Sequence, residues 1–504
     1  MNRREFLGAL TASAATISLP GFGQSTAQAA SLAIGAVQPH STIPDEFVGL
    51  SYESAQLANP DFFSAANRAL IRIFRELAPR GNLRLGGGSS EYTTYSDEPP
   101  SGPPPFEVFG PDTSKTVKQG TVTSSLALHN LREFLDATNW SCLYGLNLGQ
   151  GTIENAVREA TAAHEILGPR LLAFQIGNEP DSFRSRFRPE TYGPDDFLTE
   201  WNRFHAAIVA AVPQAKFAGP DISNKLPYLT AFAQEASKHP DVILLTSHYY
   251  AMGPASSPQA TLQNLLDPDP KLATLKRRDL HVIAEAQEEA RLPYRMSEGN
   301  SCWDGGKPGV SDTFASALWC AGYMLQCAAR GWTGVNLHGG GNGYYTPIAG
   351  APSTGFTRRP EYFGMKFAQH FVGAQFVTAT LNDASPFVDA FVFEQAGKLE
   401  LALINKTDIP CACSLPAGAL AKPTLRLSGP AIDAKNDVRL SPVHFGHYAE
   451  VAEAAPYSAV AFELKGAIST RQESRVDIDE TSKTQNQQAQ LSFQGRCCHS
   501  ADRR

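Results

Sequence analysis

Two glutamates at the ends of apolar segments are the residues of this sequence best placed to do chemistry. Glu179 directly follows the segment 171–178, and Glu298 closes the segment 294–298. Hydrolysis of a glycosidic bond needs two such carboxyl groups, because one protonates the leaving oxygen while the other attacks or stabilises the sugar carbon. A separation of about 5–5.5 Å would permit a covalent intermediate and retained configuration. Taken singly, each glutamate is more often a turn residue, a helix cap or a surface charge, so the elements around them must decide.

Eight short apolar segments that alternate with amphipathic helical patterns could position these glutamates. The alternation runs from about residue 47 to 340 and favours a (β/α)₈ barrel, with an open doubly wound sheet as the alternative. In a barrel of eight, the fourth and seventh strands face one another, and catalytic side chains lie at the carboxyl ends of strands. Glu179 and Glu298 would hold these positions. The predicted strands are 47–53, 83–87, 142–148, 171–178, 216–221, 242–250, 294–298 and 334–338, and the clearest helical patterns are 67–78, 124–137, 154–167, 194–212 and 312–330.

The domain organisation follows from changes in this pattern along the chain. The barrel is expected over residues 31–372, although residues 31–40 could instead contribute a strand to a second domain. From residue 373 to 466, short alternating segments separated by turn residues predict a β-sandwich. Residues 467–504 are polar and lack apolar periodicity, which predicts a disordered tail. A Pro- and Gly-rich loop at 89–119 follows the second strand and is expected at the catalytic end of the barrel.

The N-terminal 30 residues resemble an export signal of the twin-arginine type. Arg3 and Arg4 precede an apolar, Ala-rich stretch, and small residues suited to cleavage follow at 27–29. The alternatives are a chance pair of arginines or an ordinary signal peptide. The sequence therefore predicts a periplasmic or secreted protein.

The composition of the 504 residues argues against several partners. The formal net charge is −7 and no block of Lys or Arg stands out, so nucleic acid and anionic membranes are poor candidates. The eight cysteines fit no zinc spacing, and no phosphate loop or dinucleotide motif is present. No metal or cofactor is expected, and the oligomeric state is not predicted.

Several segments in the right order resemble the heparanase and bacterial β-glucuronidase family, within the clan of retaining barrel glycosidases. The resemblance implies a (β/α)₈ barrel with a C-terminal β-sandwich, in which Glu179 is the acid/base and Glu298 the nucleophile. It also implies a glucuronide or uronic-acid-containing glycan as substrate. The segments are Asn178-Glu179, Leu83-Arg84-Leu85-Gly86-Gly87-Gly88, Gly219-Pro220-Asp221, Ser247-His248-Tyr249-Tyr250, Ser311-Asp312-Thr313-Phe314-Ala315 and Gly339-Gly340-Gly341-Asn342.

The resemblance also implies roles for residues around the two glutamates. Asn178 would donate a hydrogen bond to the sugar 2-hydroxyl, and Glu53 would bind hydroxyls of the terminal sugar. Tyr250 would orient the nucleophile Glu298, and Arg84 would help to keep it ionised. The structural alternatives are a buried ion pair for Arg84 and a core aromatic with a satisfied hydroxyl for Tyr250.

The loop after the nucleophile is where the family binds the substrate carboxylate, largely through backbone N–H groups. Here Gly305 and Gly306 would let the backbone approach an anion, and Lys307 could add charge. Trp303 stands where relatives place Tyr, and Asp304 is an unfavourable negative charge, and both differences argue against a preference for a uronate. An ordinary Gly-rich surface loop is the alternative. Weaker candidates for polar lining are Asn224, Asn336 and His338.

The sequence therefore leaves three hypotheses for the function. The leading hypothesis is a retaining exo-β-glucuronidase that removes terminal β-linked glucuronic acid. The second keeps the mechanism but changes the substrate, giving a β-glycosidase for a neutral sugar or an endo-acting, heparanase-like enzyme. Because no Lys and Arg cluster lies near the strand ends, exo action is favoured. The third is a non-catalytic carbohydrate-binding protein, against which the intact carboxylate pair argues.

Overall fold

The computed structural model describes residues 28–98, 120–266, 270–340 and 343–466, with the backbone alone for 28 and 270–279. The predicted signal and tail fall almost wholly outside these residues. Only the last three residues assigned to the signal, 28–30, are described, and they lie in the first strand. Within the described part of the chain, no helix combines the length and apolarity needed to cross a bilayer.

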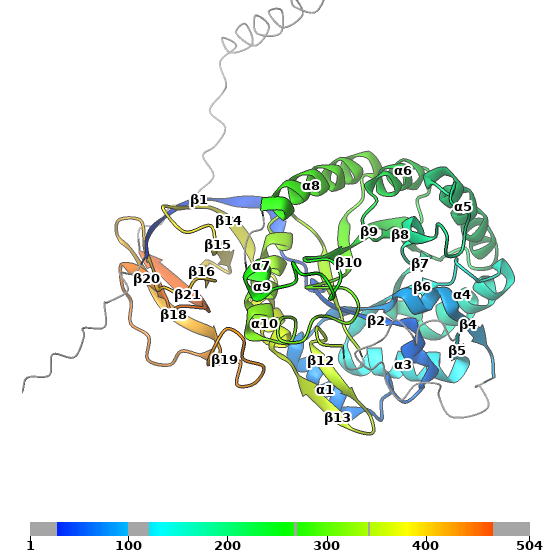
Figure 1. The fold of residues 1–504 in the computed structure, drawn as a ribbon, viewed down its shortest axis with the longest axis horizontal. Helices are drawn as coiled ribbons and strands as arrows, with labels where there is room; N and C mark the ends of the chain where they lie inside the picture. Colours follow the sequence, from blue (N-terminus) through cyan, green and yellow to red (C-terminus); the bar gives the residue numbers. More distant parts are fainter. Residues whose placement is uncertain (1–27, 99–119, 267–269, 341–342, 467–504) are drawn as a thin grey trace, which may run out of the picture.

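Eight parallel strands close into a barrel, which decides against an open sheet (Figure 1). Each of the eight segments predicted from the sequence forms one of these strands, with boundaries shifted by at most a few residues. The strands are, in chain order, β2 (Val48–Glu53), β3 (Gly81–Gly86), β6 (Trp140–Leu146), β7 (Leu171–Ile176), β8 (Phe217–Ile222), β9 (Val242–Tyr250), β10 (Tyr294–Asn300) and β11 (Gly334–His338). β11 pairs with β2 and completes the ring, so β7 and β10 are the fourth and seventh strands.

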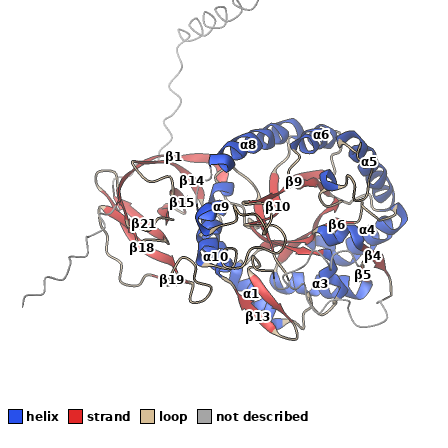
Figure 2. Cartoon of the chain, in the orientation of Figure 1, coloured by secondary structure: helices blue, strands red, loops and turns tan. Residues whose placement is uncertain are grey.

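Helices surround the barrel on its outer side (Figure 2). The first helix, α1 (Arg68–Leu77), illustrates why they form, because one of its faces is apolar and buried at Leu70, Ile73, Phe74 and Leu77. The side chain of Asn67 caps this helix by accepting a hydrogen bond from the Leu70 N–H at 3.3 Å. The α-helices are α1 (Arg68–Leu77), α3 (Ser125–Thr138), α4 (Ile153–Leu167), α5 (Pro194–Ala211), α6 (Leu226–Ala236), α7 (Leu262–Leu266), α8 (Pro270–Ala290), α9 (Phe314–Ala328) and α10 (Pro360–Gln369). Short 3₁₀ helices are η1 (Ser54–Ala58), η2 (Gly88–Tyr92), η4 (Gly168–Arg170) and η5 (Pro180–Ser182).

Two small sheets decorate the barrel. β4 (Thr93–Ser96) pairs in parallel with β5 (Thr121–Ser124), and β12 (Ile348–Ala351) forms an antiparallel hairpin with β13 (Gly355–Arg358). The segment 89–119, expected as one long loop, therefore begins with η2 and a strand. Its remainder, from residue 99, lies outside the described residues.

The second domain is a nine-stranded sheet around its own apolar core, beside the barrel (Figure 1). Its first strand, β1 (Gln28–Thr42), precedes the barrel in the chain and pairs antiparallel with β14 and parallel with β17. The other strands are β14 (Gln375–Asn382), β15 (Val388–Gln395), β16 (Lys398–Asn405), β17 (Cys411–Ser414), β18 (Ala419–Ser428), β19 (Arg439–Pro442), β20 (Val451–Ala454) and β21 (Ser458–Gly466).

Helices α9 and α10 join the two domains. α9 is buried on nearly all sides, and a Cβ added to Gly322 would lie 2.8 Å from the carboxylate of Asp389, so the helix packs directly on β15. Beyond α10, the ring of Phe371 stacks on Phe393 with centroids 4.3 Å apart. The barrel and the neighbouring face of the sheet thus share one continuous apolar core.

Candidate active site

The structure brings the two glutamates together at the carboxyl ends of the barrel strands. Glu298 lies on β10, and Glu179 follows β7 with left-handed backbone angles (φ 50°, ψ 52°). One carboxylate oxygen of each, together with a ring nitrogen of His248, lie within 4.8 Å of one another. Two carboxyl groups this close together can both act on one glycosidic bond.

Glu298 is held in an environment that favours its ionised form. The Arg84 guanidinium donates to Oε2 at 2.5 Å, and the Tyr250 hydroxyl donates to Oε1 at 2.7 Å. Ring nitrogens of His338 and His248 lie 3.7 and 4.0 Å from the same carboxylate. Burial by itself would raise the pKa of Glu298, but the charges of His338, His248 and Arg84 outweigh it and lower the pKa to about 2.

Glu179 experiences the opposite balance. Burial, helped by the negative charge of Glu298, raises the pKa of Glu179, although a hydrogen bond with His248 at 3.0 Å opposes this shift. Its side chain is 27% exposed, compared with 8% for Glu298, so it faces the open side of the site. Between the two pKa values one group is a carboxylic acid and the other a carboxylate.

Below the glutamates, Arg84 and Asp221 form a buried polar network. Arg84 is fully buried and donates to Asn178 Oδ1 at 2.7 Å, to Gln175 at 3.1 Å and to Asp221. This contact leaves the Asn178 amide nitrogen as the group able to donate to a substrate. The ion pair expected as the structural alternative for Arg84 is present, and the same guanidinium also holds the nucleophile candidate.

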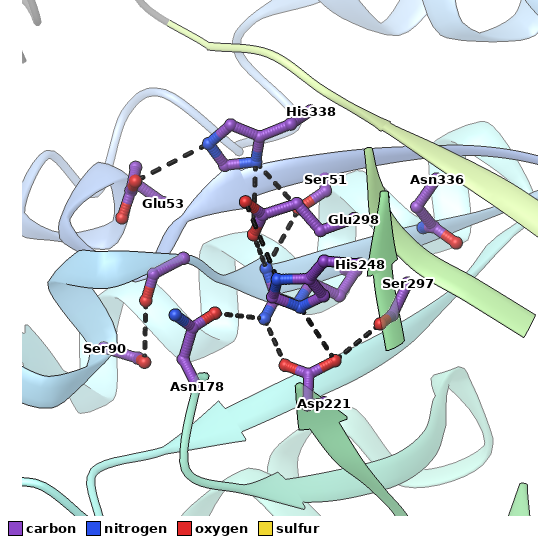
Figure 3. Close-up of polar contacts among 12 residues, drawn as sticks. Ser51, Glu53, Ser90, Asn178, Asp221, His248, Ser297, Glu298, Asn336 and His338 are labelled. Carbon is purple, nitrogen blue, oxygen red and sulfur yellow. Dashed lines mark hydrogen bonds and ion pairs between the residues drawn. The ribbon is translucent and has the colours of Figure 1, made fainter. Parts of the chain in front are cut away.

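Asp221 and His248 were recognised in the sequence only as parts of motifs, with no role assigned. Asp221 accepts from the Ser297 hydroxyl at 2.5 Å, and His248 Nε2 lies 3.2 Å from it (Figure 3). Although burial opposes both shifts, the charges of Arg84 and then His248 lower the pKa of Asp221 below its usual range. The charges of Asp221 and Glu298 raise the pKa of His248 to about 10. The signal available in the sequence was their position near the ends of β8 and β9.

Glu53 and His338 lie on the side of Glu298 that faces away from Asp221 (Figure 3). Glu53 accepts from the N–H and hydroxyl of Ser89 at 2.8 and 2.6 Å, and His338 Nε2 lies 3.5 Å from its other oxygen. The Ser51 hydroxyl lies 3.0 Å from His338 Nδ1. Both line the cavity, as predicted for Glu53 as a substrate-binding residue and for His338 as a weaker candidate for polar lining.

Glu91 is a site residue that the sequence reasoning missed. It is 1% exposed and accepts from the backbone N–H groups of Asn178 at 2.5 Å, Leu148 at 3.0 Å and Gly149. Burial raises the pKa of Glu91 to about 7 against these donors. Nothing in the polar segment around Glu91 distinguishes it from a solvated charge, so no sequence signal marked it.

The loop after β10 contributes only part of the expected anion site. Trp303, Asp304 and Gly305 line the cavity, and Trp303 is 45% exposed. Gly306 has φ 82° and packs against the Tyr345 backbone, while the Lys307 ammonium donates to the Ser257 carbonyl at 3.3 Å. Neither Gly306 nor Lys307 belongs to the described residues that line the cavity.

The weaker candidates separate into two groups. Asn224 lines the same cavity as Glu179. Asn336 is fully buried: its amide donates to the carbonyls of Leu50 and Asn82 at 3.1 and 3.0 Å, and its oxygen accepts from Arg295 at 2.5 Å. Asn336 therefore holds barrel strands together and is turned away from the site. The cavity has a volume of about 800 Å³, enough for a sugar and part of its leaving group.

The chain is similar to two fungal proteins named β-glucuronidase. The chain is 25% identical over 378 residues to a β-glucuronidase of Neurospora crassa and 24% identical over 358 residues to one of Aspergillus niger. Each match covers 66% of this chain, and they cover 65% and 64% of the fungal proteins, slightly under two thirds of their lengths. No family model matches the chain.

Solved structures support the fold. A 4-O-α-L-rhamnosyl-β-D-glucuronidase of Fusarium oxysporum superimposes with a TM-score of 0.68 at 18% identity, covering 86% of this chain and all of that one. A family 51 α-L-arabinofuranosidase of Bifidobacterium longum gives 0.62 at 15% identity over 86% of this chain and 99% of its own. The predicted barrel with a C-terminal sandwich and the resemblance to β-glucuronidases are both confirmed.

Proposed function

We propose that this protein is a retaining exo-β-glucuronidase, which removes a terminal β-linked glucuronic acid by double displacement. The observation that carries the proposal is the pair Glu179 and Glu298, whose carboxylate oxygens lie within 4.8 Å while their pKa values are shifted in opposite directions. Similarity to two β-glucuronidases supports the choice of substrate.

The first half of the reaction uses both glutamates. Glu179 transfers its proton to the glycosidic oxygen as the C–O bond breaks, and an oxygen of Glu298 forms a bond to the sugar carbon. Arg84 and Tyr250 each hold one oxygen of Glu298, which fixes the direction of attack. The Asn178 amide donates to the sugar 2-hydroxyl, where a hydrogen bond stabilises the oxocarbenium-like transition state.

The second half releases the sugar. The ionised Glu179 now takes a proton from water, and the oxygen of that water bonds to the sugar carbon as the ester to Glu298 breaks. Two inversions restore the original β configuration. His248 remains hydrogen-bonded to Glu179 and next to Asp221, so the acid/base keeps its orientation in both half-reactions.

A β-glycosidase for a neutral sugar is the second candidate, and one feature favours it. Asp304 lines the cavity, whereas the Lys307 ammonium donates to the Ser257 carbonyl. A substrate carboxylate would have to be bound by the backbone around Gly305 and by neighbouring hydroxyls, against the charge of Asp304.

The deciding experiment compares 4-nitrophenyl β-D-glucuronide with the matching β-D-glucoside, and identifies the first anomer released by NMR. We expect kcat/KM for the glucuronide to exceed that for the glucoside by at least a hundredfold, with the β anomer appearing first. Preference for the glucoside would select the second candidate. Release of the α anomer would disprove retention. Absence of hydrolysis of either substrate, or full activity in Glu298→Gln, would disprove the catalytic proposal.

We also propose that the protein is exported, on the strength of Arg3 and Arg4 and the apolar stretch that follows them. The test is the Arg3→Lys, Arg4→Lys double variant, assayed for activity in the exported and internal fractions of cells. We expect the variant to accumulate inside. An unchanged distribution would rule out the twin-arginine route.

A further inference from the structure

A second cluster of metal-ligating side chains lies at the opposite end of the barrel. His205 is on α5, His239 follows α6, and Asp241 immediately precedes β9. One ligand atom of each lies within 4.8 Å of the other two. The candidate active site is at the other end of the same strand, where His248 lies about 20 Å further along at the usual rise per residue. The two clusters are therefore separate sites.

The geometry of the two histidines suits a shared ligand. The His205 and His239 ring centroids are 4.6 Å apart, and His205 Nε2 lies 2.9 Å from Asp241 Oδ2. His205 stacks on the fully buried Trp201 at 4.6 Å, which fixes the orientation of its ring. Glu235 lies 3.3 Å from His239 Nε2 and restrains the second ring.

Asp241 supplies an independent observation. Its Oδ2 contacts His205, but its Oδ1 is buried and accepts no hydrogen bond from any residue that the structure describes. A buried carboxylate oxygen without a donor is costly, because desolvation is not repaid by another contact. A cation bound between Asp241 and the two rings would satisfy it.

We propose that His205, His239 and Asp241 form a binding site for a divalent transition metal of the zinc type. Two imidazoles and one carboxylate are a donor set typical of such ions, with water completing the coordination. The side chains of His239 and Asp241 are 24% and 19% exposed, so an ion can enter from solvent. The site ties α5 to the turn between α6 and β9 at the amino end of the barrel strands, so its role is to stabilise the fold.

The test uses the full chain, freed of metal by a chelator and titrated with Zn²⁺ by calorimetry and with Co²⁺ by absorption spectroscopy. We expect one ion per chain, a rise in Tm on binding, and visible Co²⁺ bands with histidine coordination. His239→Gln and the isosteric Asp241→Asn should each weaken Zn²⁺ binding at least tenfold. Having two substitutions keeps the test valid should one of them impair folding.

Two control variants locate the ion. His281→Gln alters an exposed His–Glu pair at 3.0 Å and should bind Zn²⁺ as the wild type does. Glu179→Gln tests the other cluster within 4.8 Å, which includes His248 and Glu298, and should also leave binding unchanged. Failure of the wild type to bind stoichiometrically would overturn the proposal. Undiminished binding in both His239→Gln and Asp241→Asn, or loss of binding in Glu179→Gln, would overturn it too.

Discussion

At the scale of single residues, Glu179 and Glu298 acquire different chemistry from different neighbours. Arg84, Tyr250 and two histidines surround Glu298, whereas Glu179 has the histidine His248 as its hydrogen-bonding partner and a carboxylate beside it. The proposed reaction requires an ionised Glu298 and a protonated Glu179. Activity should therefore fall as pH drops toward about 2, where Glu298 becomes protonated, and fall again above the raised pKa of Glu179.

Tyr250→Phe should move the acid side of this profile. The hydrogen bond that this substitution removes stabilises the ionised form of Glu298. Without it, the pKa of Glu298 should rise by about one unit, and the acid limb of kcat/KM should shift to higher pH. The measurement is kcat/KM for a β-glucuronide from pH 2 to 8. An acid limb that stays in place would show that Tyr250 does not act on the nucleophile.

The two glutamates can be told apart by rescue with azide. Glu298→Ala should lower kcat by at least 10⁴-fold, and azide should restore turnover with an α-glycosyl azide as product, because it takes the place of the nucleophile. In Glu179→Ala, kcat should fall about 10²–10⁴-fold, with a smaller loss for substrates that have good leaving groups. Azide should then give the β-glycosyl azide. NMR of the products is the readout, and the reverse pattern would exchange the assigned roles.

Glu91→Gln should displace Asn178. The amide NH₂ group of the glutamine would face backbone N–H groups that now donate to the Glu91 carboxylate. Two donors facing one another repel, so the backbone at Asn178 should shift and kcat/KM should fall about 10–100-fold. A 2-deoxy substrate should be affected much less, because it lacks the hydroxyl that Asn178 is proposed to bind. Glu159→Gln is the matched control, since Glu159 is 3% exposed and bonds Tyr144 on the outer side of the barrel. Equal losses with both substrates would assign Glu91 to stability alone.

At the scale of elements, α1 shows how local sequence specifies a barrel helix. The Asn67 side chain caps the helix through the Leu70 N–H and also donates to the Phe62 carbonyl at 2.7 Å. Asn67→Ala should reduce the free energy of unfolding by about 1–2 kcal/mol. Arg72→Ala, on the exposed face of the same helix, should change it by less than about 0.5 kcal/mol. Denaturant unfolding measures both free energies. If the two variants lost similar amounts of stability, the Asn67 cap would not stabilise the helix.

At the scale of the whole molecule, the barrel and the sheet domain should unfold as one unit. Phe393 on β15 is 1% exposed and packs on Phe371 and Phe376, with ring centroids 4.3 and 4.8 Å away. Phe393→Ala should reduce the free energy of unfolding by about 3–5 kcal/mol. The Tm should fall while a single unfolding transition remains, as seen both by calorimetry and by fluorescence. Two transitions in the wild type would show that the shared core does not couple the domains.

The sequence by itself determined the elements and their order. Apolar periodicity is a local property, so the eight strands, the helices around them and the change to short strands after residue 373 could all be predicted. The same order placed Glu179 and Glu298 at the ends of the fourth and seventh strands. The family resemblance then added Asn178, Glu53, Tyr250 and Arg84, all of which the structure places at or directly below the site.

Only the tertiary structure decided which of the remaining polar residues belong together. Asn336 and Lys307 looked like site residues, but register turns Asn336 into the barrel and a loop carbonyl engages Lys307. Glu91 looked like a surface charge, yet it binds the backbone of Asn178, 87 residues away. His205 on α5 meets Asp241, which lies 36 residues further along the chain, only in the folded structure. Such contacts depend on how the barrel closes, and no local pattern encodes the distance between residues so far apart in the chain.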